Sequence, residues 1–312
     1  MQHNQQRRNV IKAIGCAINA PLLAGILPRV TFADSRELTL GSATLQVLSD
    51  GNLSLPARRL FDTEERAVEG NALFEKAGLS TDEFSPPLNI TLLQSDDKLV
   101  LFDLGSGSQF MDSAGLLPTA LESVGVDPAE VTDVVFTHAH PDHCWGLLDD
   151  FDELLCPEAT YHMHGDEFDH WLSEDTLNNS DDASLGMVAG ARNRLPLIEE
   201  RLVRFNWGDE VIPGVEAVDS RGHTPGHTSF AIHNNNESVM VLGDALIHPV
   251  LSFQRPQWPW LTDQNVEHAI ATRERLLGRL LAEKMQLIGY HLPQSGVGFV
   301  EQHEGEYRYV PG

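Results

Sequence analysis

The stretch from His138 to His143 places three histidines and one aspartate within six residues. His138 and His140 are two residues apart, and alternate residues of an extended chain point to the same side. Pro141 then forces a turn, so Asp142 and His143 follow at the start of an expected helix. This turn therefore offers two pairs of ligands to two neighbouring positions. Imidazole and carboxylate groups without thiolate suit zinc or another divalent first-row ion.

Three later segments of the chain offer partners for this turn. Each follows an apolar run typical of a strand: His223 and His227 in "GHTPGH", Asp244 in "VLGDA" and His291 in "LIGYH". Open α/β folds gather their sites at the carboxyl ends of strands. We therefore expect these side chains to converge with the 138–143 turn on a metal site, with both His223 and His227 as candidates.

The elements that must position these residues alternate between strands and helices, which predicts an α/β fold. Hairpins are expected over 37–51 and 89–107. Further strands are expected over 131–137, 159–164, 201–207, 215–220, 228–234, 238–244 and 285–291, and helices over 116–124, 167–172, 187–200 and 266–283, with a loop over 178–184. No linker rich in Pro, Gly or Ser divides the chain after residue 34, so residues 34–312 are expected to form one mature domain.

The first 33 residues differ from the rest of the chain. The paired Arg7 and Arg8 precede an apolar run of about 15 residues, and small residues stand before a cleavage point after Ala33. This order resembles a twin-arginine export signal. We expect residues 1–33 to be removed and the mature protein to be periplasmic or secreted, without stable membrane insertion. An N-terminal membrane anchor is the alternative, although a span usually needs about 20 apolar residues.

The charge of the chain limits its partners. It carries 46 acidic and 21 basic residues, a formal net charge of −25, and such a field repels phosphate backbones. Nucleic acid is therefore not expected as a partner, and a small-molecule substrate is. Cys144 and Cys156 remain in the mature chain. We expect two shielded free thiols, and one disulfide at most is the alternative.

The ordered set of histidines and aspartates resembles the ligand set of the metallo-β-lactamase superfamily. That resemblance implies an αββα four-layer sandwich with two divalent metal ions, with Zn²⁺ as the expected ion, and it suggests a homodimer. One metal would be held by His138, His140 and His227, the other by Asp142, His143 and His291, and Asp244 would bridge them. His223 is expected to shape the loop or to support the ligands, and Asp103 to order the ligand loops by hydrogen bonds.

Segments near the mature start, at 170–179 and at the carboxyl end resemble one branch, methyl parathion hydrolase and its exported relatives. From this resemblance and from the aromatic segment 253–260 we expect a substrate pocket lined by Phe110, Trp171, Met187, Phe253 and Trp258. The pair Met187 and Val188 stands where that branch has aromatic residues, which weakens any preference for organophosphates. His248, four residues after Asp244, is a candidate for the lining of the cleft.

The expected chemistry is hydrolysis by a hydroxide that bridges the two metals, with Asp142 and Asp244 as the carboxylates that take part. An apolar ester, lactone or phosphotriester is the expected substrate, because no cationic clamp accompanies the aromatic residues. An iron-dependent sulfur dioxygenase or a thioester hydrolase resembling glyoxalase II is the alternative on the same fold. A metal-free binding protein is a third possibility, which the complete ligand set disfavours.

Overall fold

Two seven-stranded sheets form the centre of the fold, and each is built from one half of the chain. The computed structural model describes residues 36–312, so the expected signal peptide at 1–33 lies outside the described residues. In spatial order the first sheet holds β1 (Arg36–Leu40), β2 (Ala43–Asn52), β5 (Pro87–Ser95), β6 (Lys98–Phe102), β7 (Asp133–Val135), β8 (Thr160–His164) and β9 (Leu202–Phe205). The second holds β10 (Glu210–Ile212), β11 (Val215–Asp219), β12 (Thr228–Asn234), β13 (Glu237–Val241), β14 (Gln286–Ile288), β15 (Val297–His303) and β16 (Glu306–Pro311).

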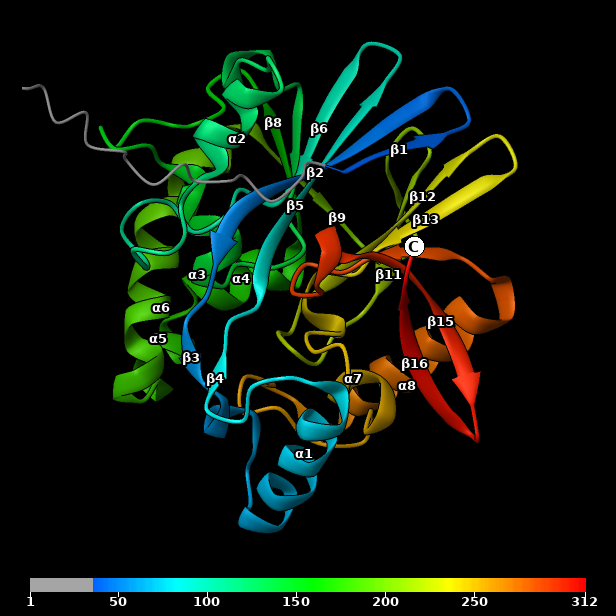
Figure 1. The fold of residues 1–312 in the computed structure, drawn as a ribbon. Coiled ribbons are helices and arrows are strands. Elements are labelled where there is room, and N and C mark those ends of the chain that lie inside the picture. The colour runs from blue at the N-terminus through cyan, green and yellow to red at the C-terminus, as the bar shows by residue number, and fades with distance from the viewer. Residues whose placement is uncertain (1–35) are drawn as a thin grey trace, which may run out of the picture. The chain divides into compact units, whose positions relative to one another are not determined.

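The helices connect the parallel strands and flank the sheets (Figure 1). Those of the first half are α2 (Leu117–Ser123), α3 (Pro141–Cys144), α4 (Gly165–Leu172), α5 (Glu174–Asn179) and α6 (Asp182–Arg194), and those of the second half are α7 (Leu251–Gln254) and α8 (Val266–Glu283). Short 3₁₀ helices lie at η1 (Ala57–Leu60), η2 (Pro128–Glu130), η3 (Trp145–Leu147), η4 (Leu195–Arg201), η5 (Gly243–Ala245) and η6 (Gln294–Gly296). Strands β6, β7, β8 and β9 run parallel, so helical crossovers must join them.

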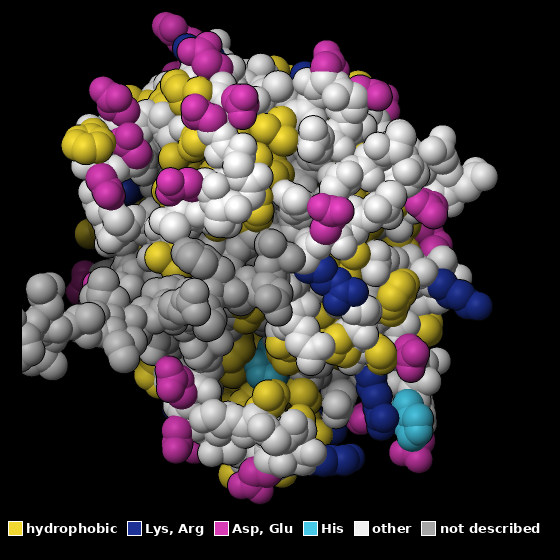
Figure 2. All heavy atoms as spheres, turned by 45° about the horizontal axis from the view of Figure 1, so that its top comes forward, with side chains coloured by type: hydrophobic (Ala, Val, Ile, Leu, Met, Phe, Trp, Pro, Cys, Tyr) yellow, Lys and Arg dark blue, Asp and Glu magenta, His cyan; other side chains and the backbone are white. Residues whose placement is uncertain are grey.

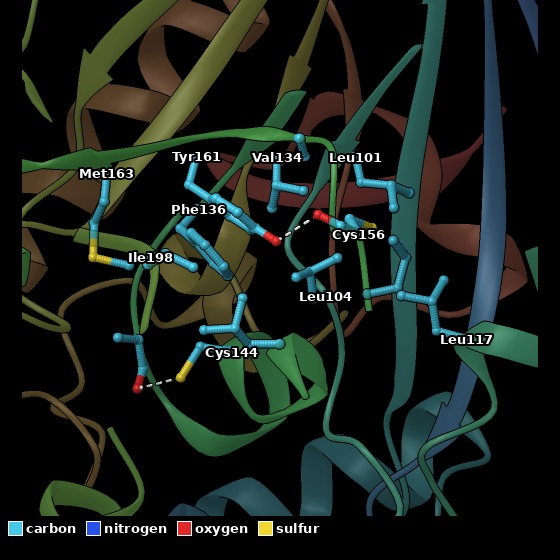
Figure 3. Packing of buried hydrophobic residues seen from close by; sticks show 14 of the residues in the cluster. Leu101, Leu104, Leu117, Val134, Phe136, Cys144, Cys156, Tyr161, Met163 and Ile198 are labelled. Carbon is cyan, nitrogen blue, oxygen red and sulfur yellow. Dashed lines mark hydrogen bonds between the residues drawn. The ribbon is translucent and has the colours of Figure 1, made fainter. Parts of the chain in front are cut away.

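Alternating side chains of the strands build separate layers of core. Val100 and Phe102 of β6 pack between the two sheets, whereas Leu101 between them in sequence faces the helices of the first half. Figure 3 shows this helix-facing core, where Tyr161 donates a hydrogen bond to the carbonyl of Cys156. Cys144 and Cys156 are both free and buried in this layer. Strands buried on both faces account for the continuous apolar runs in the sequence.

The second sheet is covered on its outer face by α8. Met240 and Leu287 from the sheet pack with Leu276 and Leu280 from the helix. Helices, sheet, sheet and helices therefore follow one another in four layers, which confirms the expected αββα sandwich. None of the described helices has the length and apolarity that crossing a membrane requires.

One segment outside the layers is absent from the sequence predictions. It contains the small sheet of β3 (Leu55–Pro56) and β4 (Glu83–Phe84) and the helix α1 (Glu64–Ala77). Thr63 caps α1 by accepting from the N–H of Arg66, and Gly78 ends it at a φ of 70°. Figure 1 shows α1 and β4 beside α7, where the rings of Phe74 and His248 stack.

The expected loop over 178–184 is shorter than predicted. Helix α5 continues to Asn179 and α6 begins at Asp182. The polar composition of this stretch reflects two helix ends, since Asp181 accepts from the N–H of Ser184 and caps α6.

Candidate metal centre

The turn from His138 to His143 leaves the end of β7 and enters α3. The carboxylate of Asp103, which follows β6, accepts hydrogen bonds from the N–H and the hydroxyl of Thr137, both at 2.7 Å. Its Oδ2 also lies 2.8 Å from Nδ1 of His143. Asp103 therefore holds both the start of the turn and one of its histidines, and it leaves Nε2 of His143 directed elsewhere.

Two groups of buried side chains gather their ligand atoms within 4.8 Å. The first ligand group is His138, His140, His223 and Asp244, and the second ligand group is Asp142, His143 and His291. Oδ1 of Asp244 lies 3.1 Å from Nε2 of His143 and 3.3 Å from Nε2 of His291, while its Oδ2 lies 3.3 Å from Nε2 of His223. Asp244 thus stands between the two groups, with one oxygen directed to each.

The two histidines of the "GHTPGH" motif lie in the opposite positions to those that the resemblance implied. His223 lies in the first ligand group, and His227 lies outside it. Both nitrogens of His227 are engaged in the loops: Nε2 accepts from the N–H of Asp244 at 2.9 Å, and Nδ1 lies 2.8 Å from the hydroxyl of Ser220. A Cβ on Gly243 would lie 2.8 Å from Nε2 of His227, so this contact also requires glycine. His227 therefore supports the loop of Asp244 and does not enter the first ligand group.

His223 occupies that place in the first ligand group. Its Nε2 lies 2.9 Å from Nδ1 of His140 and faces Asp244, and its Nδ1 lies 3.6 Å from Oδ1 of Asp263. Asp263 in turn pairs with the buried Arg273 at 3.0 Å. The chain direction at Gly222, whose φ is 128°, turns His223 inward, and residue spacing alone does not show this.

Glu167 on α4 is a supporting residue that the sequence analysis missed. Its carboxylate is fully buried and accepts from the N–H of Ala139, the indole of Trp171, the hydroxyl of Thr224 and the N–H of Gly226. One carboxylate thereby holds the turn of His138 and His140 against the loop of His223. A Cβ at Gly226 would lie 2.3 Å from the backbone nitrogen of Glu167, which explains the glycine of the motif. No signal in the sequence indicated this role, because the single glutamate in "HGDEFDHW" belongs to no recognised spacing of ligand or supporting residues.

The electrostatics of the two groups fit divalent cations. Burial opposes charge on His291, yet Asp244 and Asp142 raise its pKa to about 10. Burial likewise opposes charge on Asp244, while His291 and His143 hold its pKa well below the usual range. Nε2 of His143 and Oδ1 of Asp244 are buried without a hydrogen-bond partner among the described residues. Buried carboxylates and imidazoles that face each other in this way form a donor set that suits metal ions, and the two groups suggest two ions.

A hollow of about 140 Å³ opens beside the second ligand group. Its lining is mainly apolar and comes from the segment around α1 and β4 and from the loops after η5 and β14: Leu60, Phe74, Leu79, Ser80, Glu83, Phe84, Ser85, Pro86, Pro87, His248, Pro249, His291 and Pro293. Figure 2 shows, on the face it draws, a histidine side chain in a depression bordered by hydrophobic side chains.

The five expected pocket residues do not line this hollow. Trp171 is buried with its ring centroid 5.5 Å from that of His140, so it packs behind a ligand. Phe110 and Met187 pack on the helix-facing core of the first half. Phe253 is buried in the cluster beneath α8, and Trp258 is buried in the cluster that packs against the segment of α1. Aromatic character alone did not separate a pocket wall from a core. Many of the residues that line the hollow come from the segment around α1 and β4, which carries no motif, although His248 and His291 also line it.

A family model described as "Metallo-beta-lactamase superfamily" matches residues 87–274, which include six of the seven ligand residues of the two groups. The chain belongs to the metallo-beta-lactamase superfamily. Its sandwich and its buried histidine and aspartate groups are those of a metal-dependent hydrolase.

Among solved structures of this superfamily, the chain is similar to AidC, a dizinc quorum-quenching lactonase in complex with its product N-hexanoyl-L-homoserine. The two are 26% identical with a TM-score of 0.83, over 89% of this chain and 97% of AidC. An uncharacterized protein of Mycobacterium tuberculosis is 30% identical over 154 residues, 47% of this chain. An N-acyl homoserine lactonase of Bacillus is 21% identical over 175 residues, 50% of this chain. The chain spans 62% of the length of each of these two curated relatives.

Proposed function

We propose that this chain is a dinuclear metallohydrolase that opens apolar lactones and esters, with N-acylated lactones as the first substrate class to test. The observation that carries the proposal is the position of Asp244 between two buried ligand groups that adjoin a mainly apolar hollow. The similarity to AidC supports the lactone class. The resemblance to methyl parathion hydrolase makes phosphotriesters the second class.

The first ion would be held by His138, His140 and His223, the second by Asp142, His143 and His291, and both by Asp244. Bound divalent ions would polarise the substrate carbonyl and lower the pKa of a bound water towards neutrality. Zn²⁺ fits this set of nitrogen and oxygen donors.

The side chains of the site orient one another and handle the proton. Oδ2 of Asp142 lies 3.3 Å from Nε2 of His291, which itself lines the hollow. A carboxylate at that position can take a proton from the attacking water and return it to the leaving oxygen. The hydroxyl of Tyr290 donates to the carbonyl of Asp142, and its ring stacks on His143 at 3.9 Å. Tyr290 therefore positions the turn and has no free proton for the leaving group.

The charge around the hollow favours neutral substrates. Apart from the two histidines, the ionisable side chain in the described lining of the hollow is that of Glu83. The net charge of the chain is −25. Anionic substrates would be repelled on approach and at the rim. Among the described residues, neither a lysine nor an arginine lines the hollow. No cationic side chain of the lining would therefore bind a carboxylate or a phosphate.

A hydrolysis panel on the purified mature chain tests the proposal. N-acyl homoserine lactones, aryl esters, a paraoxon-type triester, a thioester and a cephalosporin should be assayed with the metal content measured. We expect lactones and esters to be cleaved by protein that carries two metal equivalents. Turnover of the thioester alone, or a protein that carries mainly iron, would replace this proposal with the thioester hydrolase or the sulfur dioxygenase.

We further propose export of the mature chain after cleavage behind Ala33, supported by the paired Arg7 and Arg8 and the short apolar run. Expression with Arg7 and Arg8 replaced by lysine should retain the precursor in the cytoplasm. N-terminal sequencing of exported protein should begin at Asp34. A homodimer stays a prediction, and sedimentation of the mature chain checks it.

A further inference from the structure

His248 is a buried histidine that belongs to neither ligand group. It lies four residues after Asp244, between η5 and α7, and only 2% of it is exposed. Together with His291 it lines the hollow beside the second ligand group. A histidine at this position can touch a substrate whose reacting carbonyl lies at the metals.

The first turn of α7 sets the tautomer of His248. The backbone N–H groups of Val250 and Leu251 both donate to its Nδ1 at 3.1 Å. A ring nitrogen that accepts hydrogen bonds carries no proton, so the proton of the neutral imidazole lies on Nε2. The N–H of His248 itself donates to the hydroxyl of the buried Ser252 at 3.0 Å. Backbone and side chain together thus hold the ring as an Nε2–H donor.

Two phenylalanine rings cover the faces of this imidazole. Phe74 of α1 stacks at a centroid distance of 4.7 Å and 17°, and Phe84 of β4 at 5.2 Å and 29°. With both faces covered and Nδ1 on α7, the edge that carries Nε2 is the part left to face the hollow. Among the described residues, the hydrogen bonds of the ring are the two that Nδ1 accepts. Burial lowers the pKa of His248 to about 3, so the ring is neutral over the range in which a hydrolase works.

An N–H donor in a mainly apolar hollow selects for one acceptor. Leaving such a donor unpaired inside a dry complex costs free energy, so a ligand that fills the hollow must bring an acceptor oxygen. The neutral ring does not favour a carboxylate over a carbonyl. A volume of about 140 Å³ corresponds to roughly five water-sized groups, which suits a short acyl chain.

We propose that Nε2–H of His248 donates a hydrogen bond to the amide carbonyl of an N-acylated lactone while the acyl chain fills the hollow. The inference rests on the proposed function and names His248 as the residue that distinguishes acylamide substrates from plain alkyl lactones. Phe74 and Phe84 support this role because their rings stack on the imidazole of His248 and fix its orientation.

The test compares two substrates on the metal-loaded mature chain: N-hexanoyl homoserine lactone and γ-decalactone, which lacks the amide. We expect His248→Phe to lower kcat/KM for the amide substrate about tenfold, the range of one neutral hydrogen bond, and to leave γ-decalactone within about twofold. His248→Gln, whose carboxamide can present an N–H near the position of Nε2, should restore part of the loss. The preference of the wild type should not change between pH 6 and 9.

Three further measurements separate the outcomes. Metal content should equal that of the wild type in both variants. Phe151→Ala, at a side chain that is 83% exposed and does not line the hollow, should keep the wild-type preference. In long-range ¹H–¹⁵N spectra, the Nε2–H signal of His248 should shift when N-hexanoyl homoserine is added. Equal losses for both substrates in His248→Phe, or a proton found on Nδ1, would overturn the inference. A loaded wild type that cleaves neither lactone would instead overturn the proposed function.

Discussion

The two ligand groups and the adjoining hollow meet at His291 but are built in opposite ways. The ligand groups consist of polar side chains at the carboxyl ends of strands, and loops cross-linked by Asp103 and Glu167 hold them. The hollow consists mainly of apolar side chains, many of them from the segment of α1 and β4 that lies outside both sheets. The strands of the sheets therefore position the candidate ligands, and an added segment shapes the adjoining hollow.

This difference implies that the two regions can be disabled separately. Changes in the ligand groups should remove metal and turnover together. Changes in the hollow should alter substrate preference while metal content stays constant. The variants below test that separation, beginning with the largest expected effect.

Replacement of the shared carboxylate should have the largest effect. Asp244→Asn should release at least one metal equivalent and lower kcat at least about 100-fold, because loss of a direct ligand exceeds the effect of a supporting residue. Metal analysis and kcat on the lactone check it. Asp97→Asn in the exposed β5–β6 turn is the matched control and should change neither. An Asp244→Asn enzyme with two metals and full activity would contradict the shared ligand.

The two histidines of "GHTPGH" should respond differently. His223→Gln should lose metal from the first ligand group and most activity. His227→Gln should retain metal but lower the free energy of unfolding by about 1–3 kcal/mol, since it leaves the N–H of Asp244 or the hydroxyl of Ser220 poorly paired. Metal titration and denaturant unfolding of both variants measure this. The reverse pattern would restore His227 as the ligand.

Glu167 should link stability and metal binding. In Glu167→Gln the new amide group faces N–H and hydroxyl donors, so we expect the free energy of unfolding to fall by about 2–4 kcal/mol. Metal affinity should weaken about 10–100-fold, because both ligand loops lose their common support. A competition assay with a chelator measures the affinity. Unchanged affinity in a destabilised protein would restrict Glu167 to a role in folding.

Phe84 should affect substrate preference without affecting metal. It is half-buried beside His248, so Phe84→Ala should lower kcat/KM for acylated lactones about tenfold through lost apolar contact and a less constrained ring. Metal content should stay at the wild-type level. Phe151→Ala, at a side chain that is 83% exposed, is the control and should leave the kinetics unchanged. Loss of metal in Phe84→Ala would show that the two regions are not separable.

The last prediction concerns the pH dependence of stability and not turnover. The folded-state pKa of His248, about 3, lies below its unfolded value of about 6.5, so the unfolded chain binds more protons between these values. The stability from keeping the ring neutral is complete above pH 6.5 and is lost as pH falls, by at most about 1.4 kcal/mol per pH unit. His248→Gln should flatten that slope in denaturant unfolding between pH 4 and 7. An equal slope in both proteins would argue against a buried neutral ring.

Part of the fold followed from the sequence because local patterns carried it. The turn at Gly41 and Ser42 and the helix over 266–283 lie as expected, since turn chemistry and apolar periodicity are local properties. The segment of α1 was missed because its apolar face is small: only Ala67, Gly70 and Phe74 are buried. Weak amphipathicity of this kind carries little signal in a single sequence.

The sequence by itself predicted the fold class, and its motifs resembled the superfamily to which the chain belongs. It also named six of the seven residues that gather in the two ligand groups, because those residues follow strands. Only the tertiary structure decided which histidine of "GHTPGH" points towards the ligand groups. The answer depends on the backbone at Gly222 and on the groups that each imidazole contacts, which are His140 for His223 and the N–H of Asp244 for His227. The tertiary structure also decided which aromatic residues line the hollow and which belong to the hydrophobic core. That choice depends on packing between segments far apart in the chain, such as α1 against the loop of His248, and no local pattern records such contacts.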